Sequence, residues 1–390
     1  MANTATVVTP QQPQTTVEPS GGPFIRHSEP GKGRIYDLTS QAFGGLINQP
    51  LTALPGYARA FRLYFKASGG VNGNSTAVAT AADAPESAVQ LITLWDALGT
   101  PIVSGPGFEV LRLIPMFSGG FGLKETSDTH NLPSFSAVAT GTSSAGTGNF
   151  TFASVIPLEF AAGGYGVLGM ADGDVLPKLQ IQLAGSASVY TTAPPTAPTL
   201  EVRLNADYYW LPAGQDIAPP GLGSSRQWFL QQGNPQPAAA TTATVTIPRQ
   251  GGWLDTMIFI CRDSTGARVD AWPSIFRFGL DGIGEISTNL DEIYDDMAVA
   301  FGAGATNAGG TAVFTRPTGV IALSRKTSLG RQVLGLLDTM EVALSTSPGT
   351  SMTIEGAPWG SGGTGPYTIN ALLGQIIPSG ALIQGLGDFA

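Results

Sequence analysis

The sequence has 390 residues, of which only 12% are charged, against roughly 25% in typical domains. It contains 52 Gly and 29 Pro, and its formal net charge is −9. Glycine does not recur at every third position and runs of Val, Ile, Leu and Phe are frequent, which excludes a collagen-like chain and disorder throughout. With 19 Lys+Arg against 28 Asp+Glu and no basic run, a protein that coats DNA is disfavoured, and the length suggests two domains or one long all-β chain.

Residues 1–33 are predicted to form an extended N-terminal arm. Residues 1–30 are rich in Thr, Gln, Pro and Gly and contain few apolar side chains, so they cannot build a core of their own. The N-terminus lacks the charged and apolar regions of a signal peptide, and no run of 18 apolar residues predicts a transmembrane helix. Either a floppy tail or an arm that orders on assembly fits this composition.

Residues 34–212 are predicted to form a first β-sandwich. Segments rich in Val, Ile, Leu, Phe and Tyr alternate there with stretches of Gly, Ser, Asn and Pro; they cover 60–65, 90–95, 109–114 and 151–160. In the first of them Phe61, Leu63 and Phe65 alternate with Arg62, and Lys66 continues the polar side. This period of two predicts strands with one buried face.

The rest of the chain is predicted to form a linker, a second sandwich and an extension. Residues 213–244 are rich in Pro, Gly, Gln and Ala and are interpreted as the linker. The second sandwich covers 245–358, and residues 359–390 form a C-terminal extension. Helical spacing is clearest over 289–300, with Thr288 or Asn289 as the cap, and a second short helix is a candidate over 369–373.

An internal repeat supports two sandwiches of one kind. Residues 56–66 resemble 252–262, and 155–158 resemble 320–323; further along, 176–183 resemble 337–344 and 199–202 resemble 351–354. The four matches keep their order while their separation shrinks. A duplicated sandwich with shorter loops in its second copy would produce this pattern.

No set of residues predicts catalysis, a cofactor or a metal site. Cys261 lies in an apolar run and is interpreted as a buried strand thiol, while His27 and His130 are too few for a histidine-based zinc site. The Gly-rich stretches 302–310 and 360–365 lack the Lys-Ser/Thr or the strand–helix context of phosphate loops. No Ser/His/Asp set can be assembled, so the prediction for catalytic, cofactor-binding and metal residues is none.

The densest charge is an acidic cluster at 281–296. It comprises Asp281, Glu285, Asp291, Glu292, Asp295 and Asp296. The favoured interpretation is a solvated helix face opposite Leu290, Ile293 and Met297; a divalent ion bound between subunits is the alternative.

Taken together, these features resemble the double jelly-roll major capsid proteins, in particular the tectivirus-type proteins of membrane-containing bacteriophages. The resemblance rests on 34–38 followed by a strand at 60–65, on 92–96 followed by a Gly turn and 108–113, on 156–160 with 179–183, and on 276–282 before the helix at 289. It covers most of residues 34–358. The Gly/Ala-rich loops and the segment beyond Pro358 depart from the family pattern.

The expected fold is therefore all-β, with two consecutive eight-stranded jelly rolls and a few short helices. The resemblance implies a structural protein of the virion, not an enzyme, that assembles as a homotrimer with a pseudo-hexagonal outline into an icosahedral shell. The implied partners are further copies, minor capsid or penton proteins, membrane proteins and an internal lipid membrane reached through the arm, without sequence-specific nucleic acid. The low charge independently favours a chain covered by copies of itself. A phage fibre, adhesin or lectin-like sandwich is the alternative, and an enzyme on a jelly-roll or cupin-like scaffold is disfavoured by the scarcity of His.

Overall fold

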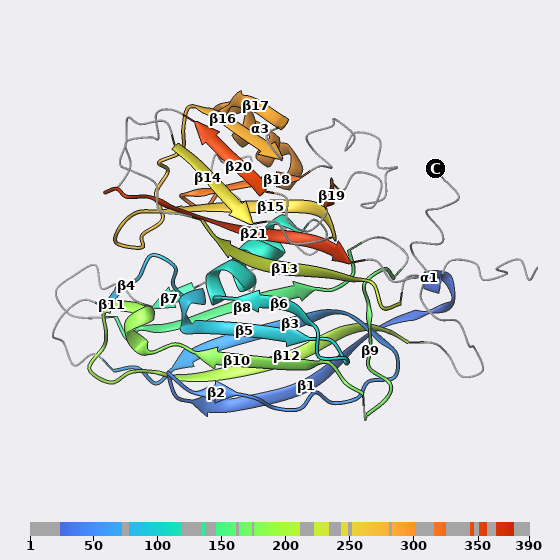
Figure 1. Ribbon diagram of the computed structural model, residues 1–390. Coiled ribbons are helices and arrows are strands. Elements are labelled where there is room, and N and C mark those ends of the chain that lie inside the picture. The colour runs from blue at the N-terminus through green and yellow to red at the C-terminus, as the bar shows by residue number, and fades with distance from the viewer. Residues whose placement is uncertain are drawn as a thin grey trace, which may run out of the picture.

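The structure is a computed structural model. The residues it describes are 24–71, 78–118, 134–136, 146–160, 164–173, 175–210, 222–233, 243–248, 252–280, 283–301, 316–324, 344–346, 351–356 and 364–377. Figure 1 shows two stacked layers of β-structure, with the earlier strands below and the later ones above. None of the helices in this part of the chain is long and apolar enough to cross a membrane.

The first half of the chain forms two facing sheets. One has the order β1 (Glu29–Gln41), β12 (Thr199–Trp210), β3 (Tyr57–Ser68), β8 (Asn149–Pro157) and β7 (Ser134–Ser136), with β9 (Leu168–Gly169) beside β3. The other has the order β6 (Pro101–Gly105), β5 (Val89–Trp95), β10 (Lys178–Leu183) and β2 (Leu46–Ile47). A short pair, β4 (Ala79–Thr80) with β11 (Tyr190–Thr192), lies at one end.

The second half repeats this arrangement. One sheet has the order β13 (Ser225–Gln232), β21 (Thr368–Ile377), β15 (Gly252–Arg262) and β18 (Val320–Ser324), with β19 (Leu344–Thr346) beside β15. The other has the order β14 (Ala243–Pro248), β20 (Ser351–Gly356), β16 (Ile275–Leu280) and β17 (Ile283–Asn289).

Both halves have the connectivity of an eight-stranded jelly roll. When the eight principal strands of each half are numbered along the chain, one sheet reads first-eighth-third-sixth and the other second-seventh-fourth-fifth. In each half the segment between the fifth and sixth strands contains a helix: η2 (Phe108–Leu113) and α2 (Ile114–Phe117) in the first, α3 (Leu290–Phe301) in the second. The prediction of an all-β fold with two consecutive jelly rolls and a few short helices is confirmed.

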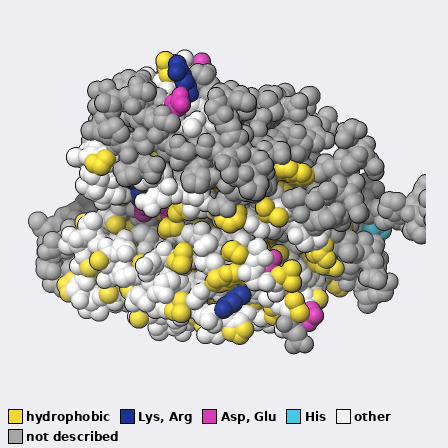
Figure 2. Space-filling view, viewed as in Figure 1, with side chains coloured by type: hydrophobic (Ala, Val, Ile, Leu, Met, Phe, Trp, Pro, Cys, Tyr) yellow, Lys and Arg dark blue, Asp and Glu magenta, His cyan; other side chains and the backbone are white. Residues whose placement is uncertain are grey.

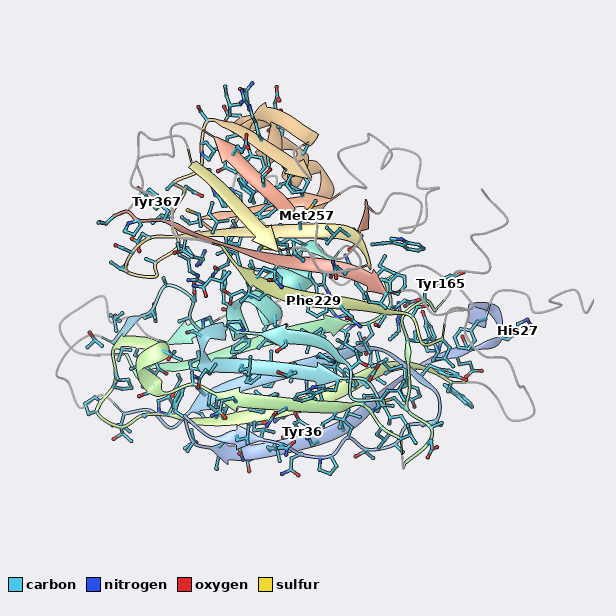
Figure 3. All side chains as sticks on the ribbon, viewed as in Figure 1. His27, Tyr36, Tyr165, Phe229, Met257 and Tyr367 are labelled. Atoms are coloured by element: carbon cyan, nitrogen blue, oxygen red, sulfur yellow. The ribbon has the colours of Figure 1, made fainter. Side chains whose placement is uncertain are left out.

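The two rolls share a sheet and a core. Strand β6 of the first roll pairs in parallel with β13 of the second, with Val103 opposite Trp228 and Ser104 opposite Phe229. This pair joins the sheets into one of nine strands, and buried side chains of both rolls form one continuous cluster. In Figure 3, Phe229 lies at the level where the rolls meet, with Met257 above it in the second roll and Tyr36 below it in the first.

The alternation predicted for residues 60–66 is present in β3. Phe61, Leu63 and Phe65 are buried, whereas Arg62 is half-buried and Lys66 is exposed. The buried Phe65 stacks on Phe152 of β8 with ring centroids 4.6 Å apart. Alternation sets the two faces of the strand because successive side chains point to opposite sides.

The internal repeat is confirmed for its first two matches and wrong for its last two. Strand β3 corresponds to β15, and its neighbour β8 to β18, as predicted. The sheet orders, however, make β20 the counterpart of β10, and β21 the counterpart of β12. The predicted partners of 176–183 and 199–202, at 337–344 and 351–354, therefore each lie one strand too early in the second roll. Apolar alternation alone does not specify which strands correspond.

Helix α3 agrees closely with the prediction for 289–300. Ile293 and Met297 are buried, and Asp291 and Glu292 occupy the first turn, where carboxylates favour the positive end of the helix dipole. The Asn289 N–H donates to Glu292 Oε2 over 3.3 Å, as in half of a capping box.

Two element types differ from the prediction. Residues 108–113, expected as a strand, form the π-helical segment η2, and residues 369–373, expected as a helix, lie within strand β21. Both runs are buried on nearly all sides, and a short run of that kind is compatible with either structure. Gly107 allows the start of η2 to lie close to the 3₁₀ helix η1 (Glu86–Ala88), because a Cβ there would lie 2.1 Å from the Glu86 carbonyl oxygen.

The strand positions also differ from the predicted segment boundaries. The range predicted as a linker, 213–244, contains β13, and the range predicted as an extension, 359–390, contains β21. These strands pair antiparallel over eight residues, from Ser225 opposite Ile377 to Gln232 opposite Asn370. A pairing between segments so far apart in the chain has no local sequence signal. Of the predicted arm, residues 1–23 lie outside the described residues, and Glu29 already begins β1.

Candidate functional site

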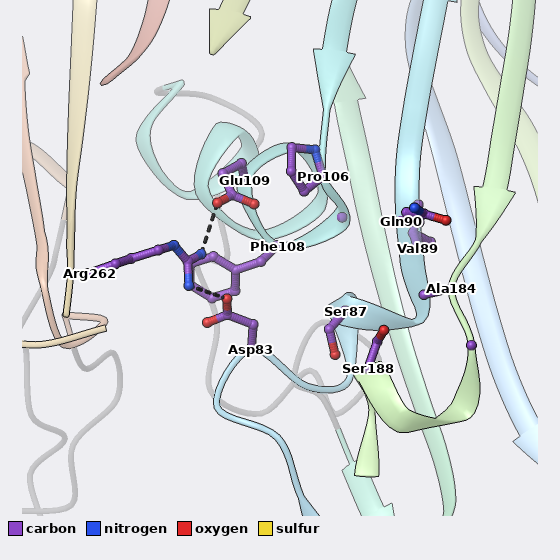
Figure 4. A pocket seen from close by; sticks show the side chains of 12 residues that line it. Asp83, Ser87, Val89, Gln90, Pro106, Phe108, Glu109, Ala184, Ser188 and Arg262 are labelled. Carbon is purple, nitrogen blue, oxygen red and sulfur yellow. Dashed lines mark hydrogen bonds and ion pairs between the residues drawn. The ribbon is translucent and has the colours of Figure 1, made fainter. Parts of the chain in front are cut away.

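The junction between the rolls holds a network of paired charges. Arg262, at the end of β15 in the second roll, forms ion pairs with Asp83 at 2.7 Å and with Glu109 of η2 at 2.9 Å, both in the first roll. Arg268 also pairs with Asp83 at 2.5 Å and its guanidinium lies 4.2 Å from the centre of the Phe108 ring. Figure 4 shows Arg262 reaching between the two carboxylates.

Burial determines how strongly these groups depend on one another. The side chain of Glu109 is 4% exposed and that of Arg262 17% exposed. Burial by itself lowers the pKa of Arg262, but the charges of Asp83 and Glu109 outweigh it and the pKa is raised overall. The guanidinium of Arg262 therefore stays charged, and its ion pair with Glu109 connects the second roll to the helical segment η2 of the first.

A cavity of about 340 Å³ opens beside this network. It is lined by Asp83, Ser87, Val89, Gln90, Pro106, Gly107, Phe108, Glu109, Ala184, Gly185, Ser188 and Arg262. The charged groups that line it are already engaged in the ion pairs shown in Figure 4. The cavity is thus the polar edge of the junction, and its charges act to hold the rolls together.

A second, deeper ion pair lies on the same face of the second roll. Arg226 of β13 and Asp255 of β15 pair at 2.6 Å, with side chains only 4% and 3% exposed. Arg226 also donates to Thr256 Oγ1 over 2.9 Å and to the Ser118 carbonyl oxygen, at the end of α2, over 3.4 Å. The guanidinium stacks 4.7 Å from the ring centre of Trp228. One arginine thereby connects two strands of the second roll to the helix of the first.

The N-terminal residues of the described chain are held by aromatic contacts. Phe24 of α1 (Phe24–His27) makes edge-to-face contacts with Tyr57 at 5.6 Å and Tyr209 at 5.7 Å. Beside them, Arg59 pairs with Glu159 at 2.8 Å. Phe24, the first described residue, is therefore fixed against β3 and β12.

The structure describes only some of the residues for which the sequence analysis predicted no catalytic or binding role. His27 lies in α1, whereas His130 and the Gly-rich stretch 302–310 lie outside the described residues. Cys261 is fully buried in β15, in agreement with the interpretation as a strand thiol.

We expect Cys261 to react with thiol reagents only when the chain unfolds. Burial raises its pKa to about 12, and the thiolate is the reactive form. Labelling at neutral pH should be negligible in buffer and complete in denaturant, whereas a Lys178→Cys variant, with its thiol on the surface, should label one site at once. Rapid labelling of the unaltered chain in buffer would contradict this.

Four members of the acidic cluster lie on the surface of α3. Asp291, Glu292, Asp295 and Asp296 are exposed; the side chains of Asp281 and Glu285 lie outside the described set. Within the part of the chain that the structure describes, no three His, Cys, Asp or Glu side chains gather so as to hold a metal ion. The favoured interpretation of a solvated helix face agrees with the exposure of these four residues.

Sequence reasoning missed the junction charges altogether. Asp83, Glu109, Arg226 and Arg262 come from four separate segments that only the two stacked rolls bring together. The only sequence signal that concerned any of these four residues was the repeat, which aligned Arg262 with Lys66 as counterparts.

Comparison with known proteins places this fold among viral capsid proteins. No protein-family model and no curated protein matches the sequence. Among solved structures, the major capsid protein (MCP) of STIV, the Sulfolobus Turreted Icosahedral Virus, is similar with a TM-score of 0.62 and 12% identity, over 92% of this chain and 99% of that one. PBCV-1 VP54, fitted into a reconstruction of the virophage Sputnik, gives 0.53 and 12% identity over 90% and 93%. The Faustovirus major capsid protein gives 0.51 and 8% identity over 93% and 92%.

These matches define the class of fold. They extend over nearly the whole of both chains, so the likeness includes both rolls and not one sandwich alone. The chain has the fold of the double jelly-roll major capsid proteins.

Proposed function

We propose that this chain is the major capsid protein of an icosahedral virus, and that it assembles as a homotrimer with a pseudo-hexagonal outline. The observation that carries the proposal is the pair of jelly rolls with identical strand order, joined through the pairing of β6 with β13. Two equivalent rolls per chain give six per trimer, so a threefold assembly presents nearly sixfold sides to its neighbours. The full-length likeness to the STIV MCP supports the same conclusion.

The distribution of charge supports a structural role over a catalytic one. The buried charges are engaged in ion pairs that connect strands and helices, as Arg226–Asp255 and Arg262–Glu109 do. The outer face formed by β2, β10 and β5 displays few charged side chains (Figure 2). A face of this kind suits contact with neighbouring capsomers in a shell, outside the contacts that form the trimer itself.

The finer expectations are part of the same proposal. We infer a location in the virion, with minor capsid, penton or membrane proteins as further partners, and with an internal lipid membrane reached through the predicted N-terminal arm, residues 1–33. A tectivirus-type bacteriophage source remains the more specific prediction from the sequence resemblance. The anchoring of Phe24 between Tyr57 and Tyr209 supports an arm that starts from a fixed point of the shell.

The test is the mass and outline of the purified protein. Size-exclusion chromatography with light scattering should give about three times the chain mass of 40.2 kDa, and negative-stain images should show hexagonal particles or closed shells. A monomer at high concentration would contradict the proposal. A monomer that also binds on a glycan array would instead favour the fibre, adhesin or lectin-like alternative.

A further inference from the structure

The contact between the rolls of one chain has two parts, a strand pair and a contact of a helical segment with a sheet. The edge strand β6 of the first roll runs parallel to β13 of the second. The helical segment η2–α2 that follows β6 meets the outer face of the sheet containing β13, through Glu109 with Arg262 and Ser118 with Arg226. The face is the outer one because Phe259 turns inward to contact Phe276 and Phe278 of the opposite sheet, which directs its neighbours and Arg262 outward.

The chain holds a second set of the same parts without a partner. Strand β17 is the counterpart of β6 and is followed by α3; among the described residues it pairs only with β16. Strand β1 is the counterpart of β13 and pairs only with β12 in the described part of the chain. Figure 1 shows α3 at the top of the second roll and β1 at the bottom of the first, so one chain cannot bring the two together.

We propose that a second copy of this chain completes this contact: α3 of one copy packs on the outer face of β1, β12 and β3 of the next, with β17 running parallel to β1. This inference rests on the proposed function, because it names the surfaces through which the copies of a capsomer meet. The contact is head-to-tail, and a head-to-tail contact closes into a ring when its rotation permits.

Charge complementarity identifies the occupant. Helix α3 exposes four carboxylates, and its sequence contains no Lys or Arg. The opposing face carries the basic residues Lys32, Arg34, Arg62, Lys66 and Arg203. Its acidic residues Asp37, Glu201 and Asp207 already pair with arginines of the same face, which leaves Lys32 and Lys66 exposed and outside any ion pair of the described residues.

The repeat gives the expected pair. Lys66 holds the place in β3 that Arg262 holds in β15, and Asp291 is the second residue of α3, as Glu109 is of η2. The pair Glu109–Arg262 within a chain therefore predicts the pair Asp291–Lys66 between chains. Burial, together with the charges of Asp295 and Glu292, raises the pKa of Asp296, so a cation facing this helix relieves repulsion among its carboxylates.

The two contacts differ in polarity, as their assembly requires. In the second roll the outward residues Ile258 and Ile260 are apolar and fully buried. Their counterparts in the first roll, Arg62 and Tyr64, are half-buried and polar. A contact within a chain can be apolar because it forms during folding. The surfaces of a contact between folded copies are exposed to water before the copies meet, so they must be polar enough to stay soluble, and opposite charges on them speed association.

Charge reversal tests the pair. Lys66→Glu should weaken trimer formation about tenfold at low salt, and so should Asp291→Lys, while the double variant should recover most of the loss because the pair is restored with opposite sign. Lys178→Glu is the matched control: it makes the same charge change at an exposed site on β10, on the opposite sheet of the first roll, and should leave the trimer intact. Sedimentation velocity over a concentration series measures each equilibrium.

Cysteine cross-linking tests the geometry independently. A Lys66→Cys, Asp291→Cys variant should form disulfides between chains under mild oxidation, with a ladder that ends at three chains on a non-reducing gel. Lys178→Cys with Asp291→Cys should give no such ladder. The natural Cys261 is buried and does not interfere.

The outcomes separate this inference from the proposed function. If the unaltered protein is monomeric, the capsid proposal and this contact both fail. If it is a trimer that neither single reversal weakens and that gives no ladder, the contact is wrong while the capsid proposal stands.

Discussion

Replacing Arg226 by Met is expected to lower the free energy of unfolding by about 3–5 kcal/mol, because it leaves the Asp255 carboxylate buried without its guanidinium. The two side chains are among the least exposed ionic groups described, at 4% and 3%, and their atoms are 2.6 Å apart. Water cannot take the place of the guanidinium at this depth, so the desolvation of the carboxylate is no longer offset.

The Arg226 prediction is measured by denaturant unfolding with two comparison variants. Arg226→Met combined with Asp255→Leu should be less destabilised than the single variant, because both charges of this pair are then removed and neither is left buried without the other. Arg34→Met removes one partner of an ion pair whose arginine side chain is 65% exposed, and should cost less than about 1 kcal/mol. A loss of under about 1 kcal/mol for Arg226→Met alone would show that the buried pair does not hold the junction.

Replacing Phe259 by Ala is expected to cost about 3–5 kcal/mol, from lost apolar burial and from the cavity that remains. Phe259 is fully buried in β15, with ring centroids 6.3 Å from Phe276 and 6.2 Å from Phe278 on the facing sheet. It therefore joins the two sheets of the second roll.

The Phe259 variant also tests whether the rolls unfold together. Because β6 pairs with β13 and one buried cluster extends through both rolls, a single calorimetric transition should shift as a whole to lower temperature. Leu98→Ala, at a side chain 90% exposed, should leave the transition almost unchanged. Two separate transitions in the Phe259→Ala protein would mean that the junction does not couple the rolls.

Much of the fold was predictable because its signals are local. Alternation in 60–66 sets the two faces of β3, and the spacing of Leu290, Ile293 and Met297 with a cap at Asn289 sets α3. The order of similar segments predicted a duplicated sandwich, and the two rolls do share one connectivity.

The errors arose where local signals are ambiguous. Residues 108–113 and 369–373 are short runs buried on nearly every side, and no periodicity separates helix from strand in such a run. Strand β13 lies in a stretch rich in Pro, Gly and Gln that resembles a linker, and it is stabilised by β21, more than 130 residues later, and by β6.

The sequence by itself determined the all-β fold class and the duplication: strands of period two and a repeat are properties of composition and of near neighbours, which a chain carries before it folds. Only the tertiary structure decided which strands are partners, that the rolls share a sheet, and that Asp83, Glu109, Arg226 and Arg262 meet at their junction. Those contacts join residues distant in the chain, and their energies come from burial and from partners that the local sequence does not specify.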